Sequence, residues 1–282
     1  MHSFKSENCT YSARAGNLFN SFTQSIAEGA DSIGGVPTDG LVAWFNPEAG
    51  ITTSVRSGTD LQVVNWADMS GNYNLQVTAY SNGLALTPPR YIPAAGSIYN
   101  AKPYLYFDGS PGQWRNLAMP RRIDENWLLR NHGGYTVVYA QYHLTAFGQN
   151  SAYIDSVAGG ITYDNSFFYR SFVPGISYFS YKSETQPALN TVNVYAHYYN
   201  TTNGHWWLSL NNKYKYSYYT DGIIQRSLAD PAGIYSITPG TFLSVTSSNI
   251  GMYLFDILVY NRILCEADYK KIYSYLKTRY LV

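Results

Sequence analysis

Paired carboxylates are the first residues in this chain whose spacing can be tested for catalysis. Retaining glycoside hydrolysis needs a general acid and a nucleophile about 5 Å apart. A strand can supply them through the pattern E-x-D-x-x-E, which this sequence lacks. The nearest pair, Asp124-Glu125, is adjacent in sequence, and neighbouring residues on a strand point to opposite faces. These two carboxylates are therefore not expected to converge on one bond.

Nucleophile and metal motifs are the next candidates for catalysis. The sequence has no G-x-S-x-G turn, and none of its five histidines lies in an H-E-x-x-H motif. A Ser-His-Asp or Cys-His triad is assembled in space, so this class stays open at the level of sequence. We interpret the histidines as turn, strand or surface residues: His2, His132, His143, His197 and His205. The sequence thus favours a chain that is not an enzyme.

Two clusters combine aromatic rings with amide or charged groups, which is the composition of many sugar-binding sites. They are Trp114-Arg115-Asn116 and Asn203-Gly204-His205-Trp206-Trp207. If Trp206 and Trp207 both lie on a strand, they point to opposite faces, so one is expected in the core and one exposed. The candidate ligand-binding residues are therefore Trp114, Asn203, His205, Trp206 and Trp207.

The two cysteines, Cys9 and Cys265, lie at opposite ends of the chain. This separation excludes a C-x-x-C metal or redox motif. We expect two free thiols, and the alternative is a disulfide between them.

The composition points to strands and to contact surfaces. Charged residues make up 13% of the chain and aromatics 17%, and tyrosine alone contributes 29 residues. Tyrosine packs well on a pleated sheet and provides contact area for proteins or sugars at low entropy cost. The net charge of +1, with scattered basic residues, argues against nucleic-acid binding. No apolar run of about 18 residues is present, so no membrane span is expected.

Short strands separated by turn residues fill the chain from residue 41 onward. The clearest segments are rich in Val, Tyr, Phe and Leu and are bounded by Gly, Pro, Asn or Asp: residues 41–45, 104–107, 135–142, 191–198, 206–210, 241–245 and 252–260. Asn211-Asn212 predicts a hairpin turn, because Asn tolerates positive φ. No βαβ pattern appears, so the expected fold class is an all-β sandwich or barrel.

One helix is predicted at the end of the chain, over residues 265–280. Acidic residues occupy its first turn and basic residues its last, which complements the helix dipole. Its apolar stripe, expected to pack against a sheet edge, consists of Tyr269, Ile272, Tyr273, Leu276 and Tyr280.

Residues 1–38 are predicted to form an N-terminal arm and linker, separate from a sandwich over residues 39–282. If residues 17–28 are helical, four apolar residues share one face: Leu18, Phe19, Phe22 and Ile26. Two readings stay open, in which this face packs on its own sandwich or docks on a neighbouring subunit.

A set of ordered motifs resembles laminin G-like jelly-roll domains of the concanavalin A-like lectin/glucanase superfamily. The set begins with the segments 41–45 (LVAWF) and 66–72 (WADMSGN), continues with 103–109 (PYLYFDG) and 135–140, and ends with 250–264 and the helix. The resemblance implies an antiparallel β-sandwich over residues 41–282. Within it we expect Trp44 and Trp66 to be core residues.

The same resemblance makes calcium the cofactor to consider, because many members bind it through Asp, Asn and backbone oxygens. The weak candidate ligands are Asp155, Asp164 and Asn165. Loop Asp and Asn residues more often hydrogen-bond their own backbone, so the favoured prediction is a chain without a cofactor.

Fold alone does not assign a function in this superfamily. We expect a structural or interaction protein of a large assembly, such as a virion surface component that also binds glycans, with the arm contacting other subunits. The start lacks a secretory signal, so synthesis in the cytosol and release with a virion would fit this role. The alternative is a free-standing carbohydrate-binding lectin or adhesion module, and a glycoside hydrolase ranks last.

Overall fold

The computed structural model describes most of the sandwich and the C-terminal helix. The described residues are 32–69, 74–76, 86–108, 114–118, 134–144, 152–156, 159–163, 167–173, 176–183, 190–200, 205–211, 213–218, 243–248 and 251–280. The proposed docking face in the arm, formed by Leu18, Phe19, Phe22 and Ile26, lies outside these residues. The division into an arm and a sandwich therefore stays a prediction.

The described residues are predominantly β-strand. The strands are β1 (Ser32–Ile33), β2 (Val36–Pro37), β3 (Leu41–Phe45), β4 (Ile51–Ser57), β5 (Asp60–Ala67), β6 (Asn74–Gln76), β7 (Leu86–Thr87), β8 (Arg90–Ile92), β9 (Tyr104–Asp108), β10 (Trp114–Ala118), β11 (Gly134–His143), β12 (Ala152–Ser156), β13 (Gly159–Tyr163), β14 (Phe167–Val173), β15 (Ile176–Ser183), β16 (Val192–Asn200), β17 (His205–Leu210), β18 (Lys213–Tyr218), β19 (Leu243–Ser248) and β20 (Gly251–Tyr260). All the strands predicted from the sequence are confirmed; the prediction over 41–45 has the bounds of β3, and the others differ from the observed strands at one or both ends.

Strand β20 is the centre of the hydrogen-bonded ladder. It pairs with β11 along one edge, and with β9 and β3 along the other. From β11 the ladder continues through β16 and β17 to β18. From β9 it continues through β8, β5 and β6 to β10, and then through β19, β12, β13 and β14 to β15. All of these pairings are antiparallel.

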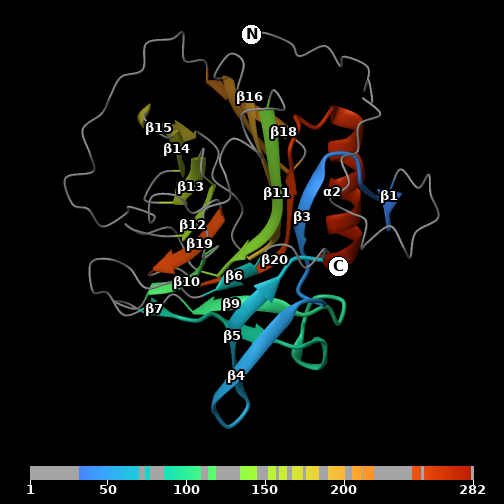
Figure 1. The fold of residues 1–282 in the computed structure, drawn as a ribbon, viewed down its shortest axis with the longest axis vertical. Helices are drawn as coiled ribbons and strands as arrows, with labels where there is room; N and C mark the ends of the chain where they lie inside the picture. The colour runs from blue at the N-terminus through green and yellow to red at the C-terminus, as the bar shows by residue number, and fades with distance from the viewer. Residues whose placement is uncertain are drawn as a thin grey trace.

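Two layers of strands face each other, and a helix covers the outer face of one of them (Figure 1). β12 to β15 lie with β10 and β19 in one layer, opposite β3, β11 and β20. Alternation along β9 shows how the second layer packs on both faces. Leu105 and Phe107 are fully buried, and the cluster beneath the helix contains Tyr104, which lies on the other face. The fold class predicted from the sequence, an antiparallel β-sandwich with a C-terminal helix, is confirmed.

The helix α2 (Glu266–Tyr280) presents the predicted stripe to the sheet. Tyr269, Ile272, Leu276 and Tyr280 are buried in one cluster with residues of β3, β11, β16 and β20. These strands include the centre of the ladder, so α2 packs on the face of the sheet. The expectation that it packs at a sheet edge was wrong. None of the helices in the described part of the chain is long and apolar enough to cross a membrane.

The motif tryptophans are core residues, as the sequence predicted. Trp66 is fully buried, and its indole packs edge-on against Phe45 with 5.6 Å between ring centroids. The nearby turn requires a glycine at position 50. Gly50 has φ +74°, and a Cβ there would lie 2.2 Å from the carbonyl oxygen of Ala67.

The Phe-Asp-Gly motif ends in a buried ion pair. Asp108, the last residue of β9, accepts a hydrogen bond from Arg115 Nε at 2.7 Å. Only 3% of the Arg115 side chain is exposed, and Arg115 also donates to the carbonyl oxygen of Pro88. This contact ties β9 to β10 and gives the motif aspartate a structural role.

Cys265, just before α2, is disulfide-bonded. The expectation of a free thiol at this position was therefore wrong. The sequence has one other cysteine, Cys9, which lies outside the described residues.

Candidate functional site

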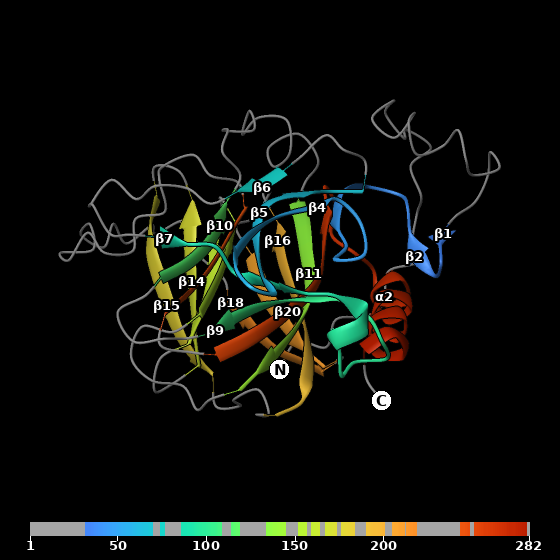
Figure 2. The same ribbon diagram turned by 90° about the horizontal axis from the view of Figure 1, so that it is seen from below.

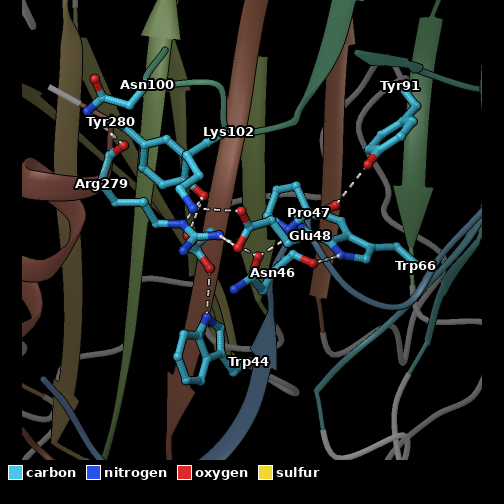
Figure 3. A network of polar contacts seen from close by, with 11 residues as sticks. Trp44, Asn46, Pro47, Glu48, Trp66, Tyr91, Asn100, Lys102, Arg279 and Tyr280 are labelled. Atoms are coloured by element: carbon cyan, nitrogen blue, oxygen red, sulfur yellow. Dashed lines mark hydrogen bonds and ion pairs between the residues drawn. The ribbon is translucent and has the colours of Figure 1, made fainter. Parts of the chain in front are cut away.

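The strongest cluster of charged groups surrounds Asp256 in β20, whose partners Trp44, Arg279 and Tyr280 are labelled in Figure 3. A β-bulge places it, because Tyr139 pairs with Ile257 whereas Gln141 pairs with Leu254, which leaves two residues of β20 opposite one of β11. As a result Phe255 and Asp256, although adjacent in sequence, both face α2. The carboxylate thus enters the interface between the sheet and the helix.

Asp256 is fully buried and has three partners. Trp44 Nε1 donates to Oδ1 at 2.7 Å, and the Tyr280 hydroxyl donates to Oδ2 at 2.5 Å. Arg279 Nε lies 3.3 Å from Oδ2. Burial raises the pKa of Asp256 to about 6, although the three partners favour the charged form. Desolvation therefore outweighs pairing at this carboxylate.

Arg279 continues the network outward to the turn after β3. Its Nη2 donates to Glu48 Oε2 at 2.5 Å and to Asn46 Oδ1 at 3.0 Å. Lys102 Nζ donates to Glu48 Oε1 at 2.8 Å. Burial alone would raise the pKa of Glu48, but the hydrogen bonds from Lys102 and Arg279 hold it below its ordinary value. We call Trp44, Asn46, Glu48, Asp256, Arg279 and Tyr280 the Asp256 network.

The end of α2 is fixed by the loop before β9, which lies against the helix (Figure 2). Asn100 Nδ2 donates to the carbonyl oxygens of Thr278 and Arg279 at 3.3 and 3.2 Å. These carbonyls have no partner within the helix, because they lie in its last turn. Asn100 and Ala101 both adopt positive φ, at 46° and 51°. Asn tolerates this region, whereas for Ala101 it costs about 1–2 kcal/mol.

The Asp256 network holds the helix on the sheet, and the Asp256 carboxylate at its centre is closed to a substrate. Asp256 has no exposed surface, and the groups that donate to it come from β3 and α2. A buried charge must be paired, so a lone aspartate in the apolar segment 252–260 was a signal that sequence reasoning missed. The basic residue at the end of the following helix, Arg279, was its natural partner.

A second cluster lies on the same face of the sheet as Asp256. It packs against the edge of the hydrophobic core between the sheet and α2. Tyr142 of β11 pairs with Tyr253 of β20, and Tyr253 pairs with Tyr106 of β9. Each of these side chains is partly exposed and packs against the edge of the core. We call these three residues the tyrosine row.

In the tyrosine row, the ring of Tyr253 contacts the rings of both Tyr142 and Tyr106. The centroids of Tyr142 and Tyr253 are 5.3 Å apart with nearly parallel rings, at 20°, and those of Tyr106 and Tyr253 are 5.3 Å apart at 68°. Burial raises the pKa of Tyr253, so its hydroxyl keeps its proton at neutral pH. The row therefore offers ring surface together with hydroxyl groups that can donate or accept.

Tyr99 supports the row from the loop before β9. Its ring packs edge-on against Tyr142 and Tyr253, with centroids 5.5 and 5.8 Å apart, and against Phe255 at 5.1 Å. Only 7% of Tyr99 is exposed. Because Tyr99 fills the space between the row and Phe255, it fixes the rings in place.

The ligand-binding residues predicted from the sequence are not brought together by the described contacts. Trp114 starts β10 opposite Ser248, and His205 starts β17 opposite Asn200. Trp206 and Trp207 lie in β17 opposite Tyr199 and Tyr198. The structure describes the backbone of these residues and not their side chains, and Asn203 lies outside the described part of the chain. Their proposed roles stay predictions.

Of the three calcium candidates, Asp155 lies within the described residues. Asp155 lies within strand β12, opposite Gly160 of β13 and Ser244 of β19. The expectation that it belongs to a loop was wrong. Asp164 and Asn165 are outside the described residues, and the described residues contain no group of three or more His, Cys, Asp or Glu side chains that could hold a metal ion.

Comparison with known proteins identifies relatives in fold and none in sequence. No protein-family model matches the chain, and no curated protein matches it. Among solved structures, a sialidase from Trypanosoma rangeli in complex with sialic acid matches with a TM-score of 0.51 and 12% identity over 88% of this chain. The receptor-binding domain of botulinum neurotoxin D matches with a TM-score of 0.51 and 11% identity over 86% of this chain.

The likeness is one of fold. The matches cover 35% of the sialidase chain and 53% of the neurotoxin domain, so this chain spans between about a third and a half of their lengths. Both are consistent with the concanavalin A-like sandwich that the sequence motifs resemble. At this level of identity they assign no residue of this chain to a function.

Proposed function

We propose that this chain is a non-enzymatic carbohydrate-binding module, and that the tyrosine row is part of its glycan contact. The observation that carries the proposal is the pairing of Tyr142, Tyr253 and Tyr106 on three adjacent strands, each partly exposed. Tyrosine combines apolar ring surface with a hydroxyl, which suits the mixed apolar and polar surface of a sugar.

The row is already ordered in the structure, which lowers the entropy cost of binding. Tyr99 packs on two of its rings, and Tyr253 also contacts the buried Tyr104, with centroids 4.6 Å apart. Side chains that are fixed before binding lose little rotamer freedom when a ligand arrives. A flat sheet face buries less of a ligand than a pocket does, so we expect weak binding at each site that is strengthened by multivalency.

Binding is proposed in place of turnover because of where the charged groups lie. Asp256 has a pKa raised to about 6, as a general acid often has. Its carboxylate is nevertheless fully buried and paired with Trp44, Tyr280 and Arg279. Its partners thus account for this residue without a catalytic role.

Two features of the proposal come from the sequence and the fold relatives. The ordered motifs support a laminin G-like jelly roll, and the sialidase of similar fold was solved in complex with sialic acid. A role on a virion surface would use the arm, whose apolar face lies outside the described residues, so that role stays an expectation from the sequence.

A glycan array probed with the protein in multivalent form tests this function. Tyr106→Ala is the informative variant, because the described ring contacts of Tyr106 are with Tyr253 and Arg90 only. We expect binding to fall about tenfold or more, which corresponds to about 1.4 kcal/mol. Tyr273→Ala is the matched control, since Tyr273 is also partly exposed but lies on α2 beside Tyr269. An unchanged array signal for Tyr106→Ala would overturn the assignment of the site.

A further inference from the structure

The tyrosine row ends in polar residues on the next two strands. Tyr106 pairs with Arg90 of β8, and Arg90 pairs with Gln62 of β5. Directly paired residues lie on the same face of a sheet, so these side chains continue the row. The guanidinium carbon of Arg90 lies 5.8 Å from the centroid of the Tyr106 ring.

Arg90 is part of a partly exposed ion pair. Its Nε lies 2.5 Å from Asp60 Oδ1, and 39% of the Arg90 side chain and 23% of the Asp60 side chain are exposed. Arg90 Nε and Asp60 Oδ1 themselves are buried, so the groups of the pair that can meet a ligand are the other N–H donors of Arg90 and the second carboxylate oxygen of Asp60. Two vicinal hydroxyls of a sugar ring need this combination, because each hydroxyl both donates and accepts.

Gln62 supplies a further donor beneath this pair. Gln62 is 8% exposed, and its Nε2 has no hydrogen-bond partner within the described part of the chain. A buried amide without a partner costs about 1–3 kcal/mol, and in native proteins water or a ligand usually satisfies such groups. Because the amide nitrogen itself is buried, its contact with a ligand would run through a bridging water.

The charges at this end of the row are balanced. Asp60 compensates Arg90, and farther along β9 Arg115 compensates Asp108 in the same way. The carboxylate of an acidic sugar would lie near Asp60, which repels it, and the nearby cation, Arg90, is already paired with Asp60. A neutral sugar meets no such repulsion, and its hydroxyls match the donors and acceptors that are present.

We propose that the Arg90–Asp60 pair and Gln62 form a subsite for a neutral saccharide with vicinal hydroxyls, at the end of the tyrosine row. This inference rests on the proposed carbohydrate-binding function and names the class of sugar that the site selects. The tyrosines supply contact area, and the polar end supplies the discrimination between neutral and acidic sugars.

The test uses an array of neutral, sialylated, uronic-acid and sulfated oligosaccharides, probed with the full chain and with Asp60→Asn. We expect the wild-type chain to prefer neutral oligosaccharides. Asp60→Asn keeps the shape of the side chain but leaves Arg90 uncompensated, so binding to neutral sugars should fall about tenfold and binding to acidic sugars should rise. Glu266→Gln is the matched control, because it removes the same charge from the exposed Lys270 pair on α2.

The outcomes separate this inference from the function on which it rests. A wild-type preference for acidic glycans would overturn the neutral subsite and leave the carbohydrate-binding function standing. Neutral binding that is unaffected by both Asp60→Asn and Arg90→Gln would place the sugar elsewhere and overturn the subsite alone. Failure of every oligosaccharide to bind would overturn the proposed function, and the subsite with it. Thermal unfolding of each variant checks that the fold is intact.

Discussion

Strand β20 carries two clusters of very different kinds on the same face of the sheet. At Asp256 the helix α2 covers the strand, and every polar group of the carboxylate meets a partner from the chain itself. At Tyr253, three residues earlier, the face borders the helix-side core and the side chains stay partly exposed. A buried carboxylate such as Asp256 can stabilise the fold although its pKa is shifted, whereas the partly exposed tyrosines are better placed to contact a ligand.

The largest expected effect is on the closed cluster. Asp256→Ala would remove the partner of Trp44 Nε1, of the Tyr280 hydroxyl and of Arg279. We expect the free energy of unfolding to fall by about 3–5 kcal/mol, as when one partner of a buried ion pair is removed. Denaturant unfolding monitored by tryptophan fluorescence measures this change.

Glu266→Ala on α2 provides the contrast. It breaks the exposed pair with Lys270, at 2.5 Å, and should cost less than about 1 kcal/mol. If the two variants lost similar amounts of stability, the Asp256 network would not be what holds the helix on the sheet.

The second prediction concerns pH and is intermediate in size. The pKa of Asp256 is raised to about 6 in the folded chain from an ordinary value of 3.8, so the folded state binds the proton more tightly than the unfolded state. The contribution of Asp256 to stability is therefore fully present below pH 3.8 and is lost as the pH rises through about 6. The loss over this window should be about 3 kcal/mol.

Asp256→Asn isolates this contribution, because the amide does not titrate. The unfolding free energy of the wild-type chain, relative to that of the variant, should fall as the pH rises from 4 to 7. A difference that stays constant over that range would show that Asp256 titrates normally in the folded chain.

The elements of this fold were readable from the sequence, because each depends on local pattern. The segments 104–107 and 252–260 alternate or run apolar as strands do, and the helix over 265–280 carries its stripe at helical spacing. The buried positions of Trp44 and Trp66 followed from the ordered motifs. Such features are set by residues close together in the chain.

The two clusters were missed because they depend on register between distant strands. Tyr106, Tyr142 and Tyr253 are three of 29 tyrosines, and nothing in their neighbourhoods marks them as a group. The bulge opposite Ala140 likewise decides that Asp256 faces the helix, since a shift of one residue reverses the face. Pattern along one strand predicts which faces alternate, but the pairing between strands decides which residues meet.

Hydroxyl-radical footprinting by mass spectrometry tests most directly whether the open cluster is the binding surface. The oligosaccharide with the strongest array signal would be added to the wild-type chain, and side-chain oxidation would be compared with and without it. We expect protection of Tyr106 and Tyr253 and unchanged oxidation of Tyr273 on α2. Protection of Trp206 or Trp207 with no change at Tyr106 and Tyr253 would contradict it and return the site to the cluster predicted from the sequence.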